Sequence, residues 1–402
     1  MSGKGEGRPY AFNSFSLFSL VTTYLRVTAD VSLLDEVIDI PAQQQDAERG
    51  DGVGTNSSVL CSLYSLAADG QKRPQIGGLA DYGGNMNLLE CVPPYQHAVP
   101  ALNAARIWML LELANLDELL QGEGHTPRCN GRQEPAAMRR QASQVLLALR
   151  RCYDASGGGY WRSLQEDGSA VPVRTVIDFH TIGSLLGAPS ASAMFAGGGS
   201  TTEQMRGEMA SFVERELRTA DWMRALSLSD DGANVSSFRP DHGTLGSYDA
   251  WPAQTMDALL TMAKPAAALS LLRAIANGQA VSEGPFGQAH TLFTKHLNGG
   301  QGQLCNTTAI PSSECFARKS GIWMMQSYNA ASAAFANTVL RSLLGFQPPL
   351  PFGAEANSSA GATMYARLPR GFTATLAELS YRGSSEWRMV SDAEGVRLEK
   401  LH

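Results

Sequence analysis

The stretch Leu79–Asn103 combines carboxylates, tyrosine rings, amides and an imidazole in a turn-rich loop that leads into an apolar helix. Aromatic rings stack on the apolar faces of a sugar, and amides, imidazoles and carboxylates hydrogen-bond to its hydroxyl groups. The mixture therefore predicts a carbohydrate-binding loop. The side chains that carry this prediction are Asp81, Tyr82, Asn85, Asn87, Glu90, Tyr95, Gln96 and His97.

A second acidic residue, Asp249, lies between the aromatic residues Tyr248 and Trp251 and rivals Asp81 as the acid of a reaction. Each of the two carboxylates also has a purely structural interpretation. Asp81 can cap the turn that contains Gly83, and Asp249 can cap the helix that begins after it. Both interpretations stay open at this point.

Two further segments carry side chains that can touch a ligand. Asp178 and His180 open a short apolar helix, where they either bind substrate or form hydrogen bonds at the start of the helix. Tyr160 and Trp161 are either a stacking platform for a sugar ring or the packed tip of a hairpin.

The bulk composition excludes several classes of function. The chain has 402 residues, of which 44% are hydrophobic and 17% charged, as in a globular protein with a sizeable core. The net charge of -6 and the lack of a basic block give no reason to expect a nucleic-acid partner. No apolar run approaches the roughly 20 residues of a membrane span. We expect no cofactor and no membrane partner, and the oligomeric state is not indicated.

The six cysteines are widely spaced, and none forms a Cys-x-x-Cys pair, so we expect no zinc site. In a chain of this length most of them are expected to be buried thiols. Cys305 and Cys315 flank a loop and can form a disulfide if the protein is exported. Several Asn-x-Ser/Thr sequons matter only in a secretory compartment. No signal peptide is visible, which slightly favours the cytoplasm, and the compartment stays open.

Apolar residues at helical spacing predict a series of helices separated by Gly-, Ser- and Pro-rich loops. The helix at 101–120 is apolar nearly all round, as expected when both sides are covered, whereas the helix at 134–153 is amphipathic. This contrast predicts a ring of helical hairpins with apolar inner and amphipathic outer helices. The expected helices span residues 13–26, 33–40, 57–68, 101–120, 134–153, 177–186, 203–226, 250–262, 265–275 and 321–344.

The composition changes after residue 345, where a Pro-rich linker begins. Alternating apolar residues in 364–368, 372–376, 379–381 and 396–398 predict strands. We therefore expect a helical domain over residues 1–345 and a small β appendage over residues 354–402. Because the strands end abruptly with the sequence, we also expect the chain to be a fragment of a longer protein.

In the order of its motifs the chain resembles the six-hairpin (α/α)6-barrel glycoside hydrolases. Within them it is most similar to the clan of processing α-glucosidase, trehalase and mannosylglycerate hydrolase. The resemblance covers roughly residues 10–350 and implies a mainly α fold, an (α/α)6 toroid. The segments that carry it are the Asp81 loop with Val99–Ala105, Gly246–Gln254, Glu283–His290 and Ala334–Phe346.

The resemblance also implies an activity, the inverting acid/base hydrolysis of an α-linked sugar in a small glycoside or oligosaccharide. It assigns Asp81 as the acid and Glu283 as the base, which an inverting enzyme holds about 6.5–9.5 Å apart. Glu283 also has a structural interpretation, as a carboxylate at a turn or helix start. The side chains expected to bind substrate are Tyr82, Tyr95, His97, Trp161, Asp178, Tyr248, Asp249, Trp251, Gln254, Gln288 and His290.

Two motifs depart from the pattern of the clan. The clan's Ser-Gly-x-Asp is here Gly78-Leu-Ala-Asp81, and its Tyr-Trp-Arg-Gly-Pro is here Tyr248-Asp-Ala-Trp-Pro252. These departures loosen the inferred substrate and leave the choice of acid between Asp81 and Asp249 open.

Two other functions are compatible with the sequence. A catalytically inactive relative would keep an aromatic groove and bind carbohydrate without cleaving it. An epimerase or lyase on the same scaffold would use histidines as proton carriers, and would need His97, His180, His242 and His290 to converge in one cavity.

Overall fold

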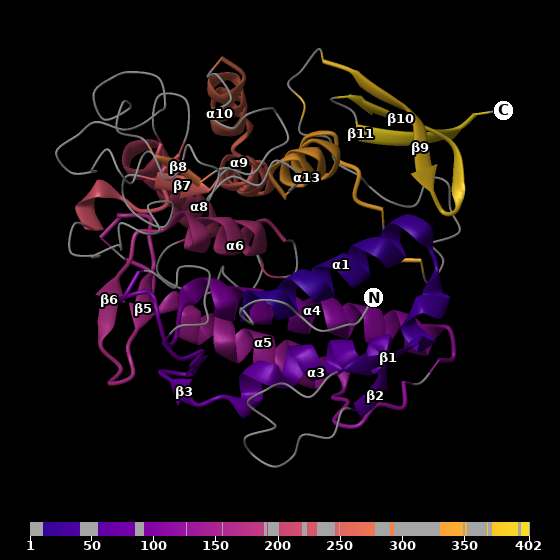
Figure 1. The fold of residues 1–402 in the computed structure, drawn as a ribbon, viewed down its shortest axis with the longest axis horizontal. Helices are drawn as coiled ribbons and strands as arrows, with labels where there is room; N and C mark the ends of the chain where they lie inside the picture. Colours follow the sequence, from indigo (N-terminus) through magenta and orange to yellow (C-terminus); the bar gives the residue numbers. More distant parts are fainter. Residues whose placement is uncertain are drawn as a thin grey trace, which may run out of the picture.

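The structure is a computed structural model and is mainly helical, with small antiparallel sheets (Figure 1). Among the residues it describes, no helix is both long and apolar enough to cross a membrane. In strands β7 and β8 only the backbone is described. The described residues are 11–40, 55–84, 92–125, 127–154, 156–188, 191, 201–218, 223–230, 246–248, 250–277, 290–292, 330–348, 350–351, 368, 372–392 and 395–401.

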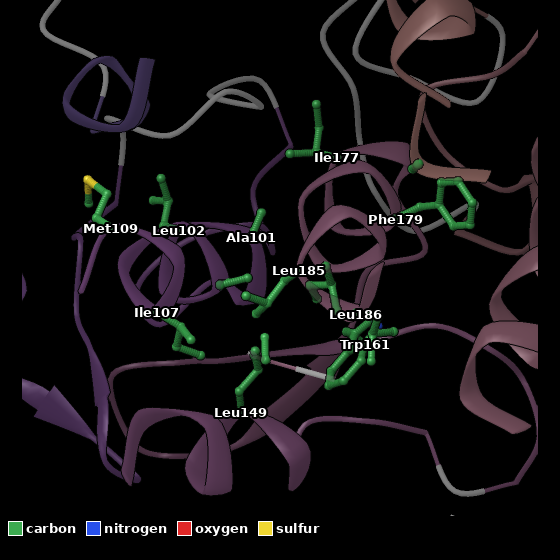
Figure 2. Packing of buried hydrophobic residues seen from close by; sticks show 14 of the residues in the cluster. Ala101, Leu102, Ile107, Met109, Leu149, Trp161, Ile177, Phe179, Leu185 and Leu186 are labelled. Atoms are coloured by element: carbon green, nitrogen blue, oxygen red, sulfur yellow. The ribbon is translucent and has the colours of Figure 1, made fainter. Parts of the chain in front are cut away.

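Helix α4 (Pro100–Gly122) lies at the centre of the lower half of the molecule in Figure 1. It packs against α1 (Phe12–Thr28), α3 (Val59–Lys72), α5 (Pro135–Arg150) and α6 (Val176–Gly187). Because neighbours cover it on several sides, residues on every face of α4 are buried. The prediction that the helix at 101–120 is covered on both sides is confirmed. Figure 2 shows apolar side chains of α4, α5 and α6 filling the space between these helices.

Helices α6 and α9 (Trp251–Thr261) run side by side in the same direction. His180, near the start of α6, bonds to Thr255 in the first turns of α9, and Gly187, at the end of α6, lies against Thr261 at the end of α9. A Cβ atom at Gly187 would lie 2.0 Å from Thr261 Cγ2, so only glycine permits this close approach.

The C-terminal helical segment continues this parallel set. It consists of α13 (Ala330–Asn337) and the π-helical turn η5 (Thr338–Leu343). The Thr338 hydroxyl donates to the Ala253 carbonyl at 3.0 Å, and the Ser342 hydroxyl bonds to the Asp257 carboxylate one turn later. These matched pairs mean that η5 runs parallel to α9.

Helices α5 and α8 run in the opposite direction to the parallel set. Arg139, near the start of α5, bonds to Asn115 and Glu118 near the end of α4. Arg206, in α8 (Thr202–Phe212), donates to the Leu186 carbonyl at the end of α6. Helix α10 (Pro265–Asn277) follows α9 after a short turn, with proline at its first position as expected.

Short antiparallel strand pairs connect the helices. The pairs are β1 (Val37–Ile40) with β2 (Thr55–Ser58), β3 (Gln75–Ile76) with β4 (Leu79–Ala80), β5 (Arg162–Leu164) with β6 (Ala170–Pro172), and β7 (Gly246–Tyr248) with β8 (His290–Leu292).

The C-terminal strands form one three-stranded antiparallel sheet in the order β11-β10-β9. Its strands are β9 (Ala374–Tyr381), β10 (Ser384–Asp392) and β11 (Gly395–Lys400). The sheet lies against the helices, because the Arg382 amide donates to the Val27 carbonyl at 2.8 Å and the Ser391 hydroxyl donates to the Leu344 carbonyl at 2.8 Å. The expected strand at 364–368 lies outside the described residues except for Leu368.

Two of the helix predictions are wrong in part. Residues 33–40 form the end of a 3-10 turn (Val31–Asp35) followed by strand β1, because β-branched residues there pair with β2. The expected helix at 203–226 ends after α8 and a π-helical turn (Val213–Leu217). The chain then reverses, and the Arg224 amide donates back to the Leu217 carbonyl at 2.7 Å. The first residues of the expected helix at 321–344 lie outside the described part.

The expectation that the cysteines are mostly thiols is wrong for one pair. Cys61 and Cys129 form a disulfide between the start of α3 and the loop that precedes α5, with their Cα atoms 5.2 Å apart. Cys152 is a buried free thiol, whereas Cys305 and Cys315 lie outside the described residues.

Removing this disulfide should destabilise the fold. It closes a loop between residues 68 positions apart, and a cross-link of that span typically contributes about 2–4 kcal/mol. The variant with Cys61→Ser and Cys129→Ser should therefore unfold at lower denaturant concentration. A reductant should lower the unfolding midpoint of the unsubstituted protein and leave that of the double variant unchanged. An equal effect on both proteins would contradict the prediction.

Candidate functional site

The starts of α4, α6 and α9 lie at the same end of the molecule, because the three helices run in parallel, with α4 packed against α6 and α6 packed against α9. We call this end the site end. Most of the described side chains that sequence analysis selected come from the site end, either in the loop before α4 or in the first turns of α6 and α9.

The loop before α4 holds Asp81 beside His97. Asp81 Oδ1 accepts a hydrogen bond from the Gly83 amide at 2.8 Å and lies 3.1 Å from His97 Nδ1. The two residues are brought together because the Tyr82 amide donates to the His97 carbonyl and the His97 amide donates to the Gly83 carbonyl. Their side chains are 14% and 18% exposed, so both reach solvent. The Asp81 side chain therefore does cap the Gly83 turn, and it also has an imidazole partner.

Asn103 fixes the strand that leads into this loop. Its side-chain oxygen accepts from the Ala80 amide at 2.8 Å, and its side-chain nitrogen donates to the Ala80 carbonyl at 3.2 Å. The residue is fully buried in the first turns of α4. Because both backbone groups of Ala80 are tied to α4, the position of Asp81 depends on this amide.

Asp178 connects three parts of the site end. Its Oδ1 atom accepts from the Tyr95 hydroxyl at 2.8 Å and from the Ala101 amide at 2.9 Å. The carboxyl group of α6 thus satisfies an amide in the first turn of α4, which has no partner within its own helix. Asp178 Oδ2 is buried and has no hydrogen-bond partner.

Burial changes the charge of this group. Loss of solvent raises the pKa of Asp178 to about 7, although the hydrogen bonds from Tyr95 and Ala101 act in the opposite direction. The pKa of Tyr95 is raised well above its ordinary value, first by burial and then by the nearby Asp178. A substantial fraction of Asp178 therefore holds its proton near neutral pH, and Tyr95 stays a neutral donor.

A second buried pair joins α6 to α9. His180 Nε2 lies 2.6 Å from Thr255 Oγ1, and the Thr255 hydroxyl donates to the Trp251 carbonyl at 2.8 Å. Since that hydroxyl proton is already used, the His180 ring donates through Nε2. Burial lowers the pKa of His180 to about 3, so the ring is neutral at physiological pH. His97 and His180 thus bond to different partners.

The segments that carry the other candidate residues meet as a strand pair. Tyr248 and His290 are register partners in the β7–β8 pair, immediately before α9. The pairing places Tyr248 opposite His290, which is seven positions after Glu283 in the sequence. The candidate residues Glu283, Asp249 and Gln288, together with His242, lie outside the described residues.

Three candidate aromatic side chains at or near the site end are buried. Tyr95 and Trp161 are each 1% exposed and Trp251 is 5% exposed, so none offers an open ring face to a ligand in this state. Tyr153 packs against Trp161 with ring centroids 4.9 Å apart. By contrast, Tyr82 is half-buried and Gln254 is exposed.

Sequence reasoning missed two positions at the site end, Asn103 and Thr255. Asn103 is an amide within an almost continuous apolar run, which is a signal that could have identified it as a buried hydrogen-bonding residue. Thr255 gave no comparable signal, because threonine is common in helices. Among the described residues, no group of three or more His, Cys, Asp and Glu side chains is arranged to hold a metal ion.

Comparison with known proteins gives a distant structural likeness. No protein-family model matches the sequence. No curated protein matches it either. Among solved structures, the chain is similar to a rhamnosidase from Klebsiella oxytoca with rhamnose bound, at 13% sequence identity and a TM-score of 0.34. The match covers 78% of this chain and 56% of the rhamnosidase chain. A likeness at this level does not establish a family.

The raised pKa of Asp178 makes a testable statement about stability. An unfolded aspartate titrates near its model value of 3.8, whereas the folded group titrates at about 7. Between these values the folded state binds the proton and the unfolded state does not, so this group lowers stability as pH rises from about 4 to about 7. The total loss is on the order of a few kcal/mol.

The variant Asp178→Asn keeps the acceptor for Tyr95 and Ala101 but does not titrate. Urea unfolding of both proteins across pH 4–7 should show the unsubstituted protein losing stability relative to the variant. His180, whose lowered pKa acts in the opposite direction below about pH 6.5, is present in both proteins and cancels in the difference. A constant difference across this range would refute the prediction.

Proposed function

We propose that this protein is a glycoside hydrolase that cleaves an α-linked sugar from a small glycoside or oligosaccharide, with a carbohydrate as its substrate partner. The observation that carries the proposal is the gathering of the sequence-selected side chains at one end of parallel helices. The loop before α4 supplies Asp81 and His97. The first turn of α6 supplies Asp178, and the start of α9 supplies Trp251.

The proposed architecture is an (α/α)6 toroid over residues 1–345, with the β9–β11 sheet as an appendage. Two features support it. Helices α4, α6, α9 and η5 run in parallel, and α5 and α8 return beside them in the opposite direction. In addition, Arg26 of α1 bonds both to Glu112 of α4 and to the Pro348 carbonyl after η5. This arginine therefore connects the first and last helical segments of the described chain.

In the proposed reaction Asp81 donates a proton to the glycosidic oxygen as the bond from that oxygen to the anomeric carbon breaks. Glu283 takes a proton from a water molecule, whose oxygen bonds to the anomeric carbon from the opposite face. The configuration at that carbon is inverted. His97 lies close enough to Asp81 to restore its proton after each turnover. Asp249 is the rival acid of this scheme.

Substrate contacts are proposed for the half-buried Tyr82, the exposed Gln254 and the residues Tyr248, Asp249, Gln288 and His290. Trp251 is buried and is proposed to support the start of α9 rather than to touch the substrate. Asp178 and Tyr95 act in this proposal as positioning residues, because their hydrogen bonds hold the start of α4 and the loop before it. Trp161 precedes the β5–β6 hairpin and packs against Tyr153. Leu164 of this hairpin pairs with Ala98 in the loop before α4.

Replacing either proposed carboxyl group should remove hydrolysis without unfolding the protein. We expect Asp81→Asn and Glu283→Gln each to lower kcat by about 10²–10⁴-fold, the range of a general acid or base. A panel of nitrophenyl glycosides and α-linked disaccharides provides the rate, and circular dichroism tests the fold. NMR of the first sugar released should show the inverted anomer.

The matched controls are Asp167→Asn, in the exposed β5–β6 turn, and Glu386→Gln, in the exposed strand β10. Both should keep full activity. Full activity in Asp81→Asn would transfer the role of acid to Asp249, and full activity in Glu283→Gln would remove Glu283 from the mechanism. Calorimetric binding of the same sugars without turnover would instead identify a catalytically inactive carbohydrate-binding protein.

A further inference from the structure

A small cavity lies behind the Asp81 loop, between α1, α3 and α4. Its volume is about 10 Å³, and its lining includes Ser14, Asp69, Gly70, Tyr82 and Arg106. A volume of this size holds about one water-sized particle. The cavity is therefore too small for a sugar, a phosphate or a carboxylate ligand.

Arg106 places a positive charge against this cavity, and among the described residues no carboxylate forms a hydrogen bond or ion pair with it. The residue is 3% exposed, and its Nε and Nη1 atoms are buried with no hydrogen-bond partner. A buried charge is expensive unless an opposite charge and hydrogen bonds compensate it. Two unpartnered nitrogens with three N–H groups on a charged guanidinium are a donor set suited to an anion.

The neighbouring charges do not compensate Arg106. Asp69 is the carboxylate in the cavity lining, and it already accepts a hydrogen bond from Arg73 Nε at 2.7 Å. The Arg73 guanidinium in turn lies 4.7 Å from the centre of the Tyr82 ring. Among the described residues, Arg73 and Arg106 thus share the charge of one aspartate, and Asp69 forms its hydrogen bond with Arg73. Burial raises the pKa of Tyr82 to about 12, so this phenol is neutral.

The backbone of α3 is shaped to admit the arginine. Gly70 lies within α3, and a Cβ atom there would be 2.5 Å from Arg106 Cδ and 2.6 Å from Arg106 Nε. Glycine inside a helix costs roughly 0.5–1 kcal/mol relative to alanine. The glycine makes room for the guanidinium to lie across α3.

We propose that this cavity binds one halide ion, chloride under physiological conditions, against the guanidinium of Arg106. The ion supplies a negative charge to the unpartnered guanidinium nitrogens. A monatomic anion is somewhat larger than water, so the lining side chains must move apart slightly around it. The Ser14 hydroxyl and the neutral Tyr82 phenol line the same cavity and provide further donors. The inference does not depend on the proposed hydrolytic activity.

Thermal unfolding in sodium chloride and in sodium gluconate of equal ionic strength tests the site. Gluconate is too large for the cavity, so only chloride should add stability by binding the folded state. We expect the unfolding midpoint of the unsubstituted protein to be on the order of 2 °C higher in chloride. Arg106→Met should abolish this difference. The matched control Arg140→Met, on the exposed face of α5, should retain it.

A chloride effect of equal size in the unsubstituted protein and in Arg106→Met, or no chloride effect at all, would overturn the proposal. If Arg106→Met fails to fold, crystals of the unsubstituted protein grown in sodium bromide decide the question. An anomalous-scattering peak beside the Arg106 guanidinium supports a halide site. A cavity without such a peak shows that water alone fills it and rejects the site.

Discussion

The hydrogen bonds of one buried carboxyl group organise the end of the molecule where the candidate residues lie. Asp178 of α6 accepts from an amide at the start of α4 and from the hydroxyl of Tyr95 in the loop before α4. These partners are 77 and 83 positions away along the chain. Interactions of this range fix the start of α4 against the start of α6. Because Tyr95 is one of the partners, they also fix the position of the loop that carries His97.

Burial, rather than ion pairing, sets the charge of the interior at the site end. It raises the pKa of Asp178 and lowers the pKa of His180, so at neutral pH the histidine is uncharged and a substantial fraction of the acid is protonated. The ionisable pair that reaches solvent there, Asp81 with His97, lies in the loop. The pair in the loop therefore reaches solvent, whereas Asp178 and His180 behind it form a buried framework of hydrogen bonds at the helix starts.

Sequence patterns predicted those helices whose apolar and polar faces can be recognised within the helix itself. The all-round apolar pattern of α4 and the amphipathic pattern of α5 required no knowledge of the rest of the chain. The pattern failed at residues 33–40, because strand β1 depends on a partner, β2, that begins only at Thr55. It also failed after Leu217, where backbone pairing reverses the chain.

For the candidate site, the sequence likewise predicted residues that local patterns select, but not the contacts that depend on distant segments. The loop before α4 was selected by residue type, but the contact of Asp81 with His97 arises from backbone pairing within the loop, which the sequence does not encode by spacing. The burial of Trp161 likewise depends on Tyr153 and on the surrounding core. The position of Glu283 relative to Asp81 stays a prediction.

Because of the disulfide, the two ends of the α3–α4 pair are held together by different kinds of interaction. Cys61 and Cys129 join α3 to the loop after α4, at the end opposite to the start of α4. That end is held by a covalent bond, whereas the described residues at the end that carries Asp81 and Asp178 are held by hydrogen bonds and apolar packing. Heating should therefore separate these helices first at the end that carries Asp81 and Asp178, while the disulfide keeps their other end together.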